Sequence, residues 1–183
     1  QIGATTGRMG HAMFSETIRF RRKRVEFHGP AETTYAQLYG FKEYPLQTWP
    51  GMFHSLAMAP YRNTLHQSFR FLSNADAMSK VTRKQNTMLM ANDKAASQIE
   101  ELSHAADDLL GRKYVLGQHS LVLIAFGDDP KAMNEVGNAA WRDLAACGLV
   151  ATRMTKALQA AFLSMLPGAE SWRPRPGIVK SRN

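Results

Sequence analysis

Apolar and polar residues alternate in several short stretches of the chain, a pattern typical of half-buried β-strands. The first two stretches flank the basic run RRKR at residues 21–24. Ile18 and Phe20 share one parity and Val25 and Phe27 share the other, so a single straight strand would point the two pairs to opposite faces. The pattern therefore predicts a β-hairpin whose turn is basic.

Two β-α-β units are predicted after this hairpin. Each combines a strand of apolar or aromatic residues, a helix and a second strand. The first unit consists of a strand at 34–42, a short helix at 52–58 and a strand at 65–72; the second consists of a strand at 119–126, a helix from Pro130 to Gly148 and a strand at 149–154, and a last helix follows at 156–166. We expect Phe69 and Phe71, which share one face of their strand, to lie in the core.

Residues 76–112, between the two units, contain no proline, and no glycine before Gly111. Apolar residues recur there at intervals of three and four, which predicts helices packed along one seam. Asn92 and Asp93 are good N-cap residues, so we interpret the segment as two packed helices rather than one. We expect this helical insertion to pack against its own domain rather than to form an oligomeric coiled coil.

This order of elements predicts an α+β fold, a ferredoxin-like two-layer sandwich with a four-stranded antiparallel sheet and helices on one face. One strand does not suit a sheet with a bare face, because the run from Leu121 to Phe126 is apolar at both parities and needs cover on both sides. We expect the helical insertion, or a neighbouring domain or subunit, to supply the second cover.

Composition divides the chain into three parts. Residues 1–14 are rich in glycine, threonine and small polar types, and we expect a flexible segment there. Residues 15–168 are long enough to form a single α+β domain, and residues 169–183 form a basic, proline-spaced linker. Because proline favours an extended path, we expect Arg173 and Arg175 to be held out to solvent.

The net charge of +8 lies in the two ends of the chain. Residues 1–30 carry six basic and two acidic residues, residues 171–183 carry four basic and no acidic ones, and the remainder has thirteen of each. A nucleic-acid reader usually carries its charge on the folded face, so the neutral body argues against that partner. A solvated turn is the simpler interpretation of the hairpin run. The alternative is a candidate interaction patch made of Arg21, Arg22, Lys23, Arg24, Arg173, Arg175, Lys180 and Arg182.

The sequence contains no recognisable catalytic or metal-binding motif. Cys147 is the only cysteine, and no two of the six histidines have the spacing of a helical metal site. A GxxxxGK[ST] phosphate-binding loop is also absent. Asp128 and Asp129 follow an apolar strand as a Walker B pair would, but Asp129 before Pro130 is better interpreted as a helix N-cap. We therefore predict no catalytic, cofactor-binding or metal-binding residue. Solvated charge explains the carboxylates of the insertion, Glu100, Glu101, Asp107 and Asp108.

Longer segments from about Val25 onward carry a family resemblance. They are YAQLYGFKEYP (35–45), PGMF (50–53), HQSFRF (66–71), DKAASQIEEL (93–102), LLGRKYVLGQHSLVL (109–123), GDDP (127–130), AFLSMLPG (161–168), RPRP (173–176) and SRN (181–183). Together they resemble the CagE/TrbE/VirB component of type IV secretion systems. The most specific piece is LPG before a basic, proline-spaced strip that ends in SRN.

The resemblance implies a domain that precedes the motor of a large cytoplasmic ATPase at the inner face of the bacterial membrane. Such an ATPase serves conjugation, protein transport and virulence. ATP and Mg²⁺ would bind in a C-terminal nucleotide-binding domain that follows SRN, so this chain, which begins at Gln1, is expected to be a fragment. The implied partners are sibling subunits in a homo-oligomer and other secretion components. The single cysteine and the lack of an apolar run of about eighteen residues fit a cytoplasmic location.

Two functions are compatible with these observations. The favoured one is a non-catalytic assembly module of a type IV secretion ATPase, which makes protein–protein contacts in a machine that exports DNA or effector proteins. The alternative is a nucleic-acid-binding ferredoxin-like module, which would stack bases on Phe69, Phe71 and Phe126.

Overall fold

The structure is a computed structural model and describes residues 16–43, 45, 48–90, 104, 106–111 and 113–181. The segment 1–14, expected to be flexible, lies outside the described residues. The chain divides into two compact units, one formed by Gln1–His66 and Leu121–Arg175 and the other by Gln67–Ser120 and Pro176–Asn183. Strands β4 and β5 contribute residues to both units.

The described strands form an antiparallel sheet in the order β1-β2-β3-β5-β4, with β6 beside β3 and β7 beside β5. The strands are β1 (Thr17–Phe20), β2 (Val25–His28), β3 (Thr33–Glu43), β4 (Asn63–Phe71), β5 (Leu116–Gly127), β6 (Val150–Arg153) and β7 (Gly177–Lys180). The helices are α2 (His54–Ala57), α3 (Asn74–Met90), α5 (Pro130–Ala146), α6 (Leu158–Leu163) and the short 3₁₀-helix η1 (Glu170–Trp172). The mixed α and β class and the antiparallel sheet are confirmed. The expected number of four strands is wrong, because β1, β2 and β7 extend the sheet beyond the β-α-β units.

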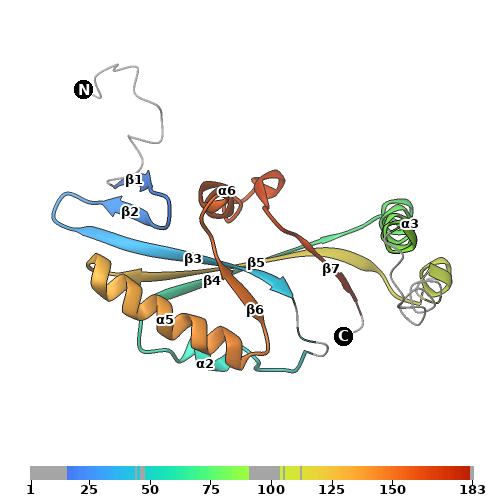
Figure 1. The fold of residues 1–183 in the computed structure, drawn as a ribbon, viewed down its shortest axis with the longest axis horizontal. Helices are drawn as coiled ribbons and strands as arrows, with labels where there is room; N and C mark the ends of the chain where they lie inside the picture. Colours follow the sequence, from blue (N-terminus) through green and yellow to red (C-terminus); the bar gives the residue numbers. More distant parts are fainter. Residues whose placement is uncertain are drawn as a thin grey trace, which may run out of the picture. The chain divides into compact units, whose positions relative to one another are not determined.

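Both faces of β3 and β5 are covered in the first unit (Figure 1). On one face, Tyr39 and Leu123 pack against α2 and α5. On the other face, Leu38 and Ile124 pack against α6. The first unit therefore has three layers, and the predicted two-layer sandwich is wrong. The second cover comes from the C-terminal helix α6 rather than from the helical insertion.

Helix α5 begins at the predicted Pro130 and ends at Ala146, two residues before the predicted Gly148, because its caps are encoded locally. Oδ1 of Asp129 accepts the backbone N–H groups of Lys131 and Ala132 at 2.7 and 2.8 Å, and Pro130 occupies the first turn, where its missing N–H has no partner to lose. Gly148 follows the helix with φ +71°, a conformation that favours glycine. Asp129 thus acts as a helix cap, as the sequence predicted.

A buried polar cluster fixes α5 to the sheet. The hydroxyl of Tyr39 lies 2.7 Å from the carbonyl oxygen of Gly137 and 2.8 Å from Oε1 of Gln37. Nε2 of Gln37 donates to Oδ1 of Asn134 at 2.7 Å. A Cβ atom at Gly137 would collide with both Gln37 and Tyr39, so glycine allows the helix to approach the strand closely.

The second unit contains the described part of the helical insertion. Ser73 caps α3 by accepting the backbone N–H of Asp76 at 3.1 Å. Leu109, from the helical residues 106–110, shares one apolar cluster with Ala77 at the start of α3. A single straight helix over 76–112 would separate these two residues by about 48 Å, since each residue adds about 1.5 Å. The described residues therefore form two helical segments that pack together, as the interpretation of the insertion predicted.

Strand β7 is a feature that the sequence analysis did not predict. Residues Gly177–Lys180 pair with residues 116–119 of β5, in the segment expected to be a linker. Residues 182 and 183 lie outside the described residues.

Candidate interaction surfaces

The predicted basic hairpin is formed by β1 and β2. The two strands pair from Phe20 with Val25 onward, and the backbone N–H of Arg21 donates to the carbonyl oxygen of Arg24 at 2.9 Å. The turn is therefore hydrogen-bonded, and the two arginines stand at its base.

A buried carboxylate holds both of these arginines. Glu26 is 4% exposed, and its oxygens accept from Nε of Arg21 at 3.1 Å and from Nε of Arg24 at 2.8 Å. Nε2 of His28 lies 3.2 Å from the same carboxylate. Burial alone would raise the pKa of Glu26, but the hydrogen bonds from Arg24, Arg21 and His28 outweigh it and hold this pKa below its usual range. Arg21 and Arg24 are thus partly neutralised by an internal partner.

The other two basic residues of the run form the tip of the hairpin. Arg22 and Lys23 are exposed, and no ion pair joins them to any residue that the structure describes. Sequence reasoning treated all four positions alike. Arg24 directly precedes β2 and lies two residues before Glu26. This spacing was the signal that could have separated them, because alternate residues of an extended chain share one face.

Aromatic packing fixes the base of the hairpin within the first unit. The ring of Phe20 lies 5.5 Å from that of Phe162 on α6, in an edge-to-face arrangement. Phe27 contacts both Phe162 and Phe126 at centroid distances of 5.9 Å. Such aromatic pairs contribute about 0.5–1.5 kcal/mol beyond the burial of their area, so the hairpin is held at a fixed place on the unit.

The C-terminal residues of the predicted patch have separate environments. Arg173 is partly buried, and its Nε has no hydrogen-bond partner among the described residues. Burial and the charge of Arg173 lower the pKa of His66. The expectation that Arg173 is held out to solvent is wrong, because its side chain is partly buried, its Nε atom is shielded from solvent and its charge acts on His66. Arg175 is exposed.

Lys180 of the predicted patch belongs to the second unit. Nζ of Lys180 lies 5.2 Å from the centre of the Tyr114 ring, a cation–π geometry. Arg182 lies outside the described residues. The structure therefore does not join the eight predicted residues into one described cluster.

Two exposed aromatic residues differ from the sequence expectation. Phe69 is 42% and Phe71 68% exposed, and their rings form an edge-to-face pair at 4.9 Å. The prediction that they lie in the core is wrong, because alternation identifies the face that a strand shares but not whether another layer covers that face. Phe126 is partly buried, with the guanidinium of Arg62 4.5 Å from its ring centre.

The candidates for chemistry have structural roles where they are described. Cys147 is 2% exposed, and its thiol donates to the carbonyl oxygen of Met52 at 2.9 Å. Asp108 pairs with Lys113 at 2.7 Å on the surface. Within the described ranges, no three His, Cys, Asp or Glu side chains are grouped so as to hold a metal ion. None of the described helices is long and apolar enough to cross a membrane.

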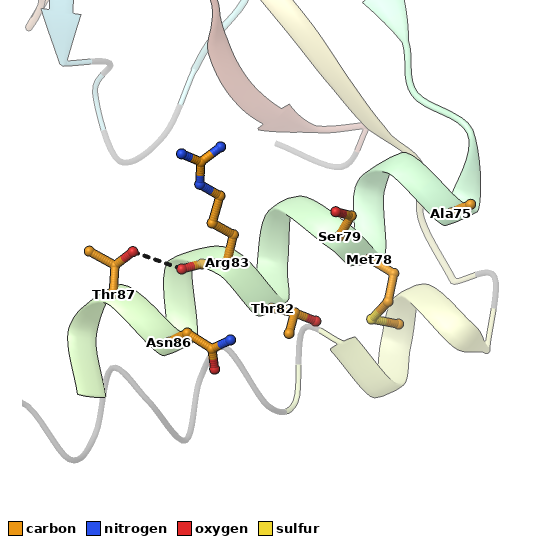
Figure 2. A pocket seen from close by; sticks show the side chains of 7 residues that line it. All are labelled: Ala75, Met78, Ser79, Thr82, Arg83, Asn86 and Thr87. Atoms are coloured by element: carbon orange, nitrogen blue, oxygen red, sulfur yellow. Dashed lines mark hydrogen bonds between the residues drawn. The ribbon is translucent and has the colours of Figure 1, made fainter. Parts of the chain in front are cut away.

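Sequence reasoning missed a set of basic residues on α3. Lys80, Arg83 and Lys84 are all exposed, and their spacing of three and four places them on one side of the helix. Figure 2 shows that Arg83 extends to one side of α3, whereas Met78 and Asn86 point to the other. The spacing is visible in the sequence, but it does not show that these side chains border a groove.

Comparison with known proteins places the chain in a family. The sequence model of the CagE, TrbE, VirB family, described as a component of the type IV transporter system, matches residues 4–175. The chain belongs to this family.

Curated relatives of the CagE, TrbE, VirB family are similar over the whole chain or most of it. The type IV secretion system protein virB4 of Bartonella henselae is 40% identical over 183 residues, which are 100% of this chain and 23% of that protein. The protein virB4 of Agrobacterium fabrum is 34% identical over 182 residues, 100% of this chain and 23% of its own length. The type IV secretion system protein PtlC of Bordetella pertussis is 32% identical over 169 residues, 92% of this chain and 20% of its own length. The chain thus spans between a fifth and a quarter of the length of these relatives.

Proposed function

We propose that this chain is a non-catalytic module of a type IV secretion ATPase and that it serves assembly of the export machine through protein–protein contacts. The structural observation that carries this proposal is the hairpin of β1 and β2. Its base is fixed by aromatic packing and its two inner arginines by Glu26, so Arg22 and Lys23 are presented at a defined place. A preorganised basic tip suits an acidic surface on another component, because little side-chain and loop entropy is lost when it binds.

The rest of the proposal follows from family membership. The parent protein would act as a homo-oligomer at the cytoplasmic face of the inner membrane, in contact with sibling subunits and other secretion components. ATP and Mg²⁺ would be bound by a part of the parent outside this chain. The cargo would be DNA or effector proteins, as in type IV secretion generally.

A charge reversal at the hairpin tip tests the assembly role. In the parent protein, Arg22→Glu with Lys23→Glu should reduce cargo transfer and co-purification of the other secretion components at least tenfold, while ATP hydrolysis by the parent stays unchanged. Lys131→Glu with Lys156→Glu, two exposed residues of the first unit, is the matched control. Normal transfer by the hairpin variant, or ATP hydrolysis at a motor rate by the isolated chain, would contradict the proposal.

The exposed pair Phe69 and Phe71 favours one second candidate, binding of single-stranded nucleic acid by base stacking. A base stacked on an aromatic side chain contributes about 1–3 kcal/mol, so Phe71→Ala should weaken binding of an unstructured oligonucleotide about 5- to 150-fold if this function operates. Trp172→Ala, which removes another exposed aromatic residue, is the control. An affinity that falls steeply with salt but is unaffected by Phe71→Ala would exclude stacking.

A further inference from the structure

The basic residues of α3 border a groove in the second unit. The groove has a volume of about 360 Å³ and is lined by Lys80, Arg83, Lys84 and Thr87 of α3, Gln118 of β5, and Pro176 and Ile178 at β7. No lining residue is acidic. None of the three basic side chains forms an ion pair with a described residue, so their positive charge is available to a ligand.

The groove lies beside an open edge of the sheet. Within the described part of the chain, β7 pairs only with β5. The backbone N–H of Ser181 donates to the carbonyl oxygen of Val115 at 2.9 Å, which makes these two residues a hydrogen-bonded pair of an antiparallel ladder. Hydrogen-bonded and non-hydrogen-bonded pairs alternate along such a ladder. Ile178 and Lys180 therefore occupy non-hydrogen-bonded positions, and their backbone N–H and C=O groups point away from β5.

The same two residues connect the open edge to the groove. Ile178 and Lys180 are two positions apart, so their side chains share one face of β7, and Ile178 lines the groove together with its cross-strand neighbour Gln118. Ile178 is 45% exposed and supplies an apolar contact. An extended chain laid along β7 would thus meet backbone hydrogen-bonding groups, an apolar side chain and a basic wall at once.

We propose that this groove binds an extended acidic segment of a partner protein, which adds to the sheet as a strand beside β7. Backbone hydrogen bonds to Ile178 and Lys180 would hold the segment, and its carboxylates would face Lys80, Arg83 and Lys84. Strand addition to an open edge is an established mode of peptide recognition, with backbone bonds supplying affinity and alternate side chains supplying specificity. An oligonucleotide or an anionic lipid could use the positive charge, but neither would use the open backbone edge.

Labelled peptides test this proposal on the 183-residue chain. The probe is a ten-residue peptide that alternates glutamate and valine, and fluorescence anisotropy measures its binding. It should bind at least tenfold more tightly than a peptide that alternates lysine and valine, and its affinity should fall as salt is raised. Two further peptides carry N-methyl groups on all glutamates or on all valines. One of them should bind at least tenfold more weakly than the parent peptide, because its N–H groups toward β7 are blocked, and the other should not.

Charge reversal of the groove provides the second arm. The triple variant Lys80→Glu, Arg83→Glu, Lys84→Glu should bind the acidic peptide with an affinity at least tenfold lower than that of the wild type. The control Lys131→Glu, Arg142→Glu, Lys156→Glu reverses three exposed residues of the first unit, changes the net charge equally and should bind normally. Circular dichroism verifies that both variants fold.

Three results would overturn the proposal. The first is that both triple variants lose affinity for the acidic peptide equally. The second is that both methylated peptides bind as tightly as the unmethylated peptide. The third is that a single-stranded oligonucleotide or a vesicle of anionic lipid binds more than tenfold tighter than the peptide and loses binding in the groove variant, which would make the groove a phosphate site. The assay uses this chain alone, so its outcome is separate from that of the transfer experiment on the hairpin tip.

Discussion

At the scale of single residues, buried polar groups determine what the surface of this chain presents. Glu26 is buried among cationic partners and pairs with Arg21 and Arg24, two of the four residues in the basic run. The Gln37 and Tyr39 side chains similarly fill the contact between α5 and the sheet. Buried polar groups of this kind stabilise the fold only while every partner is present. Replacing one partner should therefore lower the free energy of unfolding measurably.

Replacement of Glu26 by glutamine should destabilise the chain. Glu26→Gln keeps the shape of the side chain but removes the charge that pairs with Arg21 and Arg24, and we expect the free energy of unfolding to fall by about 1–3 kcal/mol. Urea denaturation followed by circular dichroism measures the difference. Asp108→Asn is the control, because the exposed pair with Lys113 contributes about 0–1 kcal/mol. Equal losses in the two variants would show that Glu26 has no special role.

The stability difference between the wild type and Glu26→Gln should depend on pH. The folded-state pKa of Glu26 lies below its unfolded value of about 4.3, so its contribution is complete above about pH 5 and is lost as pH falls through the lowered folded-state pKa. Urea titrations between about pH 6 and pH 2.5 measure the difference in the free energy of unfolding between the two proteins. This difference should stay constant down to about pH 5 and shrink at lower pH. A difference that grows toward low pH would have the wrong sign for this account.

At the scale of secondary-structure elements, close packing between α5 and β3 depends on the absence of a side chain at Gly137. In the interior of an exposed helix, replacement of glycine by alanine usually raises the free energy of unfolding by about 1 kcal/mol. Gly137→Ala should instead destabilise by about 1–3 kcal/mol, because the new Cβ atom displaces the Gln37 amide and the Tyr39 hydroxyl. Thermal and urea unfolding measure the change. Asn138→Ala, at the exposed neighbouring position, should be neutral or slightly stabilising.

The elements were predictable from the sequence where their signals are local. Asp129, Pro130 and Gly148 identified the ends of α5 because a cap involves only nearby residues. The four-residue strand β7 was missed because its partner on β5 lies about sixty residues away and its own sequence carries no turn or alternation signal. The apolar pattern of β5 indicated that both faces of the strand are buried. It did not identify α6 as the element on one of these faces, because the pattern carries no information about which element packs there.

The candidate surfaces were predicted less completely than the elements. The basic run at the hairpin was identified, yet the division into held and free residues depends on the burial of Glu26, which sequence spacing only suggests. The groove beside β7 combines side chains from α3, β5 and β7, and no spacing within one segment reveals such a combination. The exposure of Phe69 and Phe71 likewise depends on which element covers that face of β4, and no described residue covers it fully.

At the scale of the whole molecule, stability should differ between the two compact units. Among the described residues, the first unit contains two apolar clusters on the two faces of β3 and β5, whereas the second contains one smaller cluster around Ala77 and Leu109. Regions with fewer buried contacts open locally at lower free energy than the core.

Hydrogen exchange should reveal this difference. The amide of Leu123 in the first unit should exchange at least about 100-fold more slowly than that of Val179 on β7, relative to their intrinsic rates. Both amides are expected to lie in β-ladders, so the comparison tests packing rather than the mere presence of a hydrogen bond. Equal protection would mean that the chain opens only as a whole.

The pairing of β3 has a consequence for the synthesis of this protein. This central strand is complete at Glu43, but its partners β5 and β6 begin only at Leu116 and Val150. At about 5–20 residues per second, the nascent chain waits on the order of ten seconds before β3 can be paired on its second side. Among the strand pairings that the structure describes, only those of the β1-β2-β3 meander can form early, because their contacts are local. This meander is therefore the segment where a chaperone or a premature partner would first encounter an open apolar strand on the ribosome.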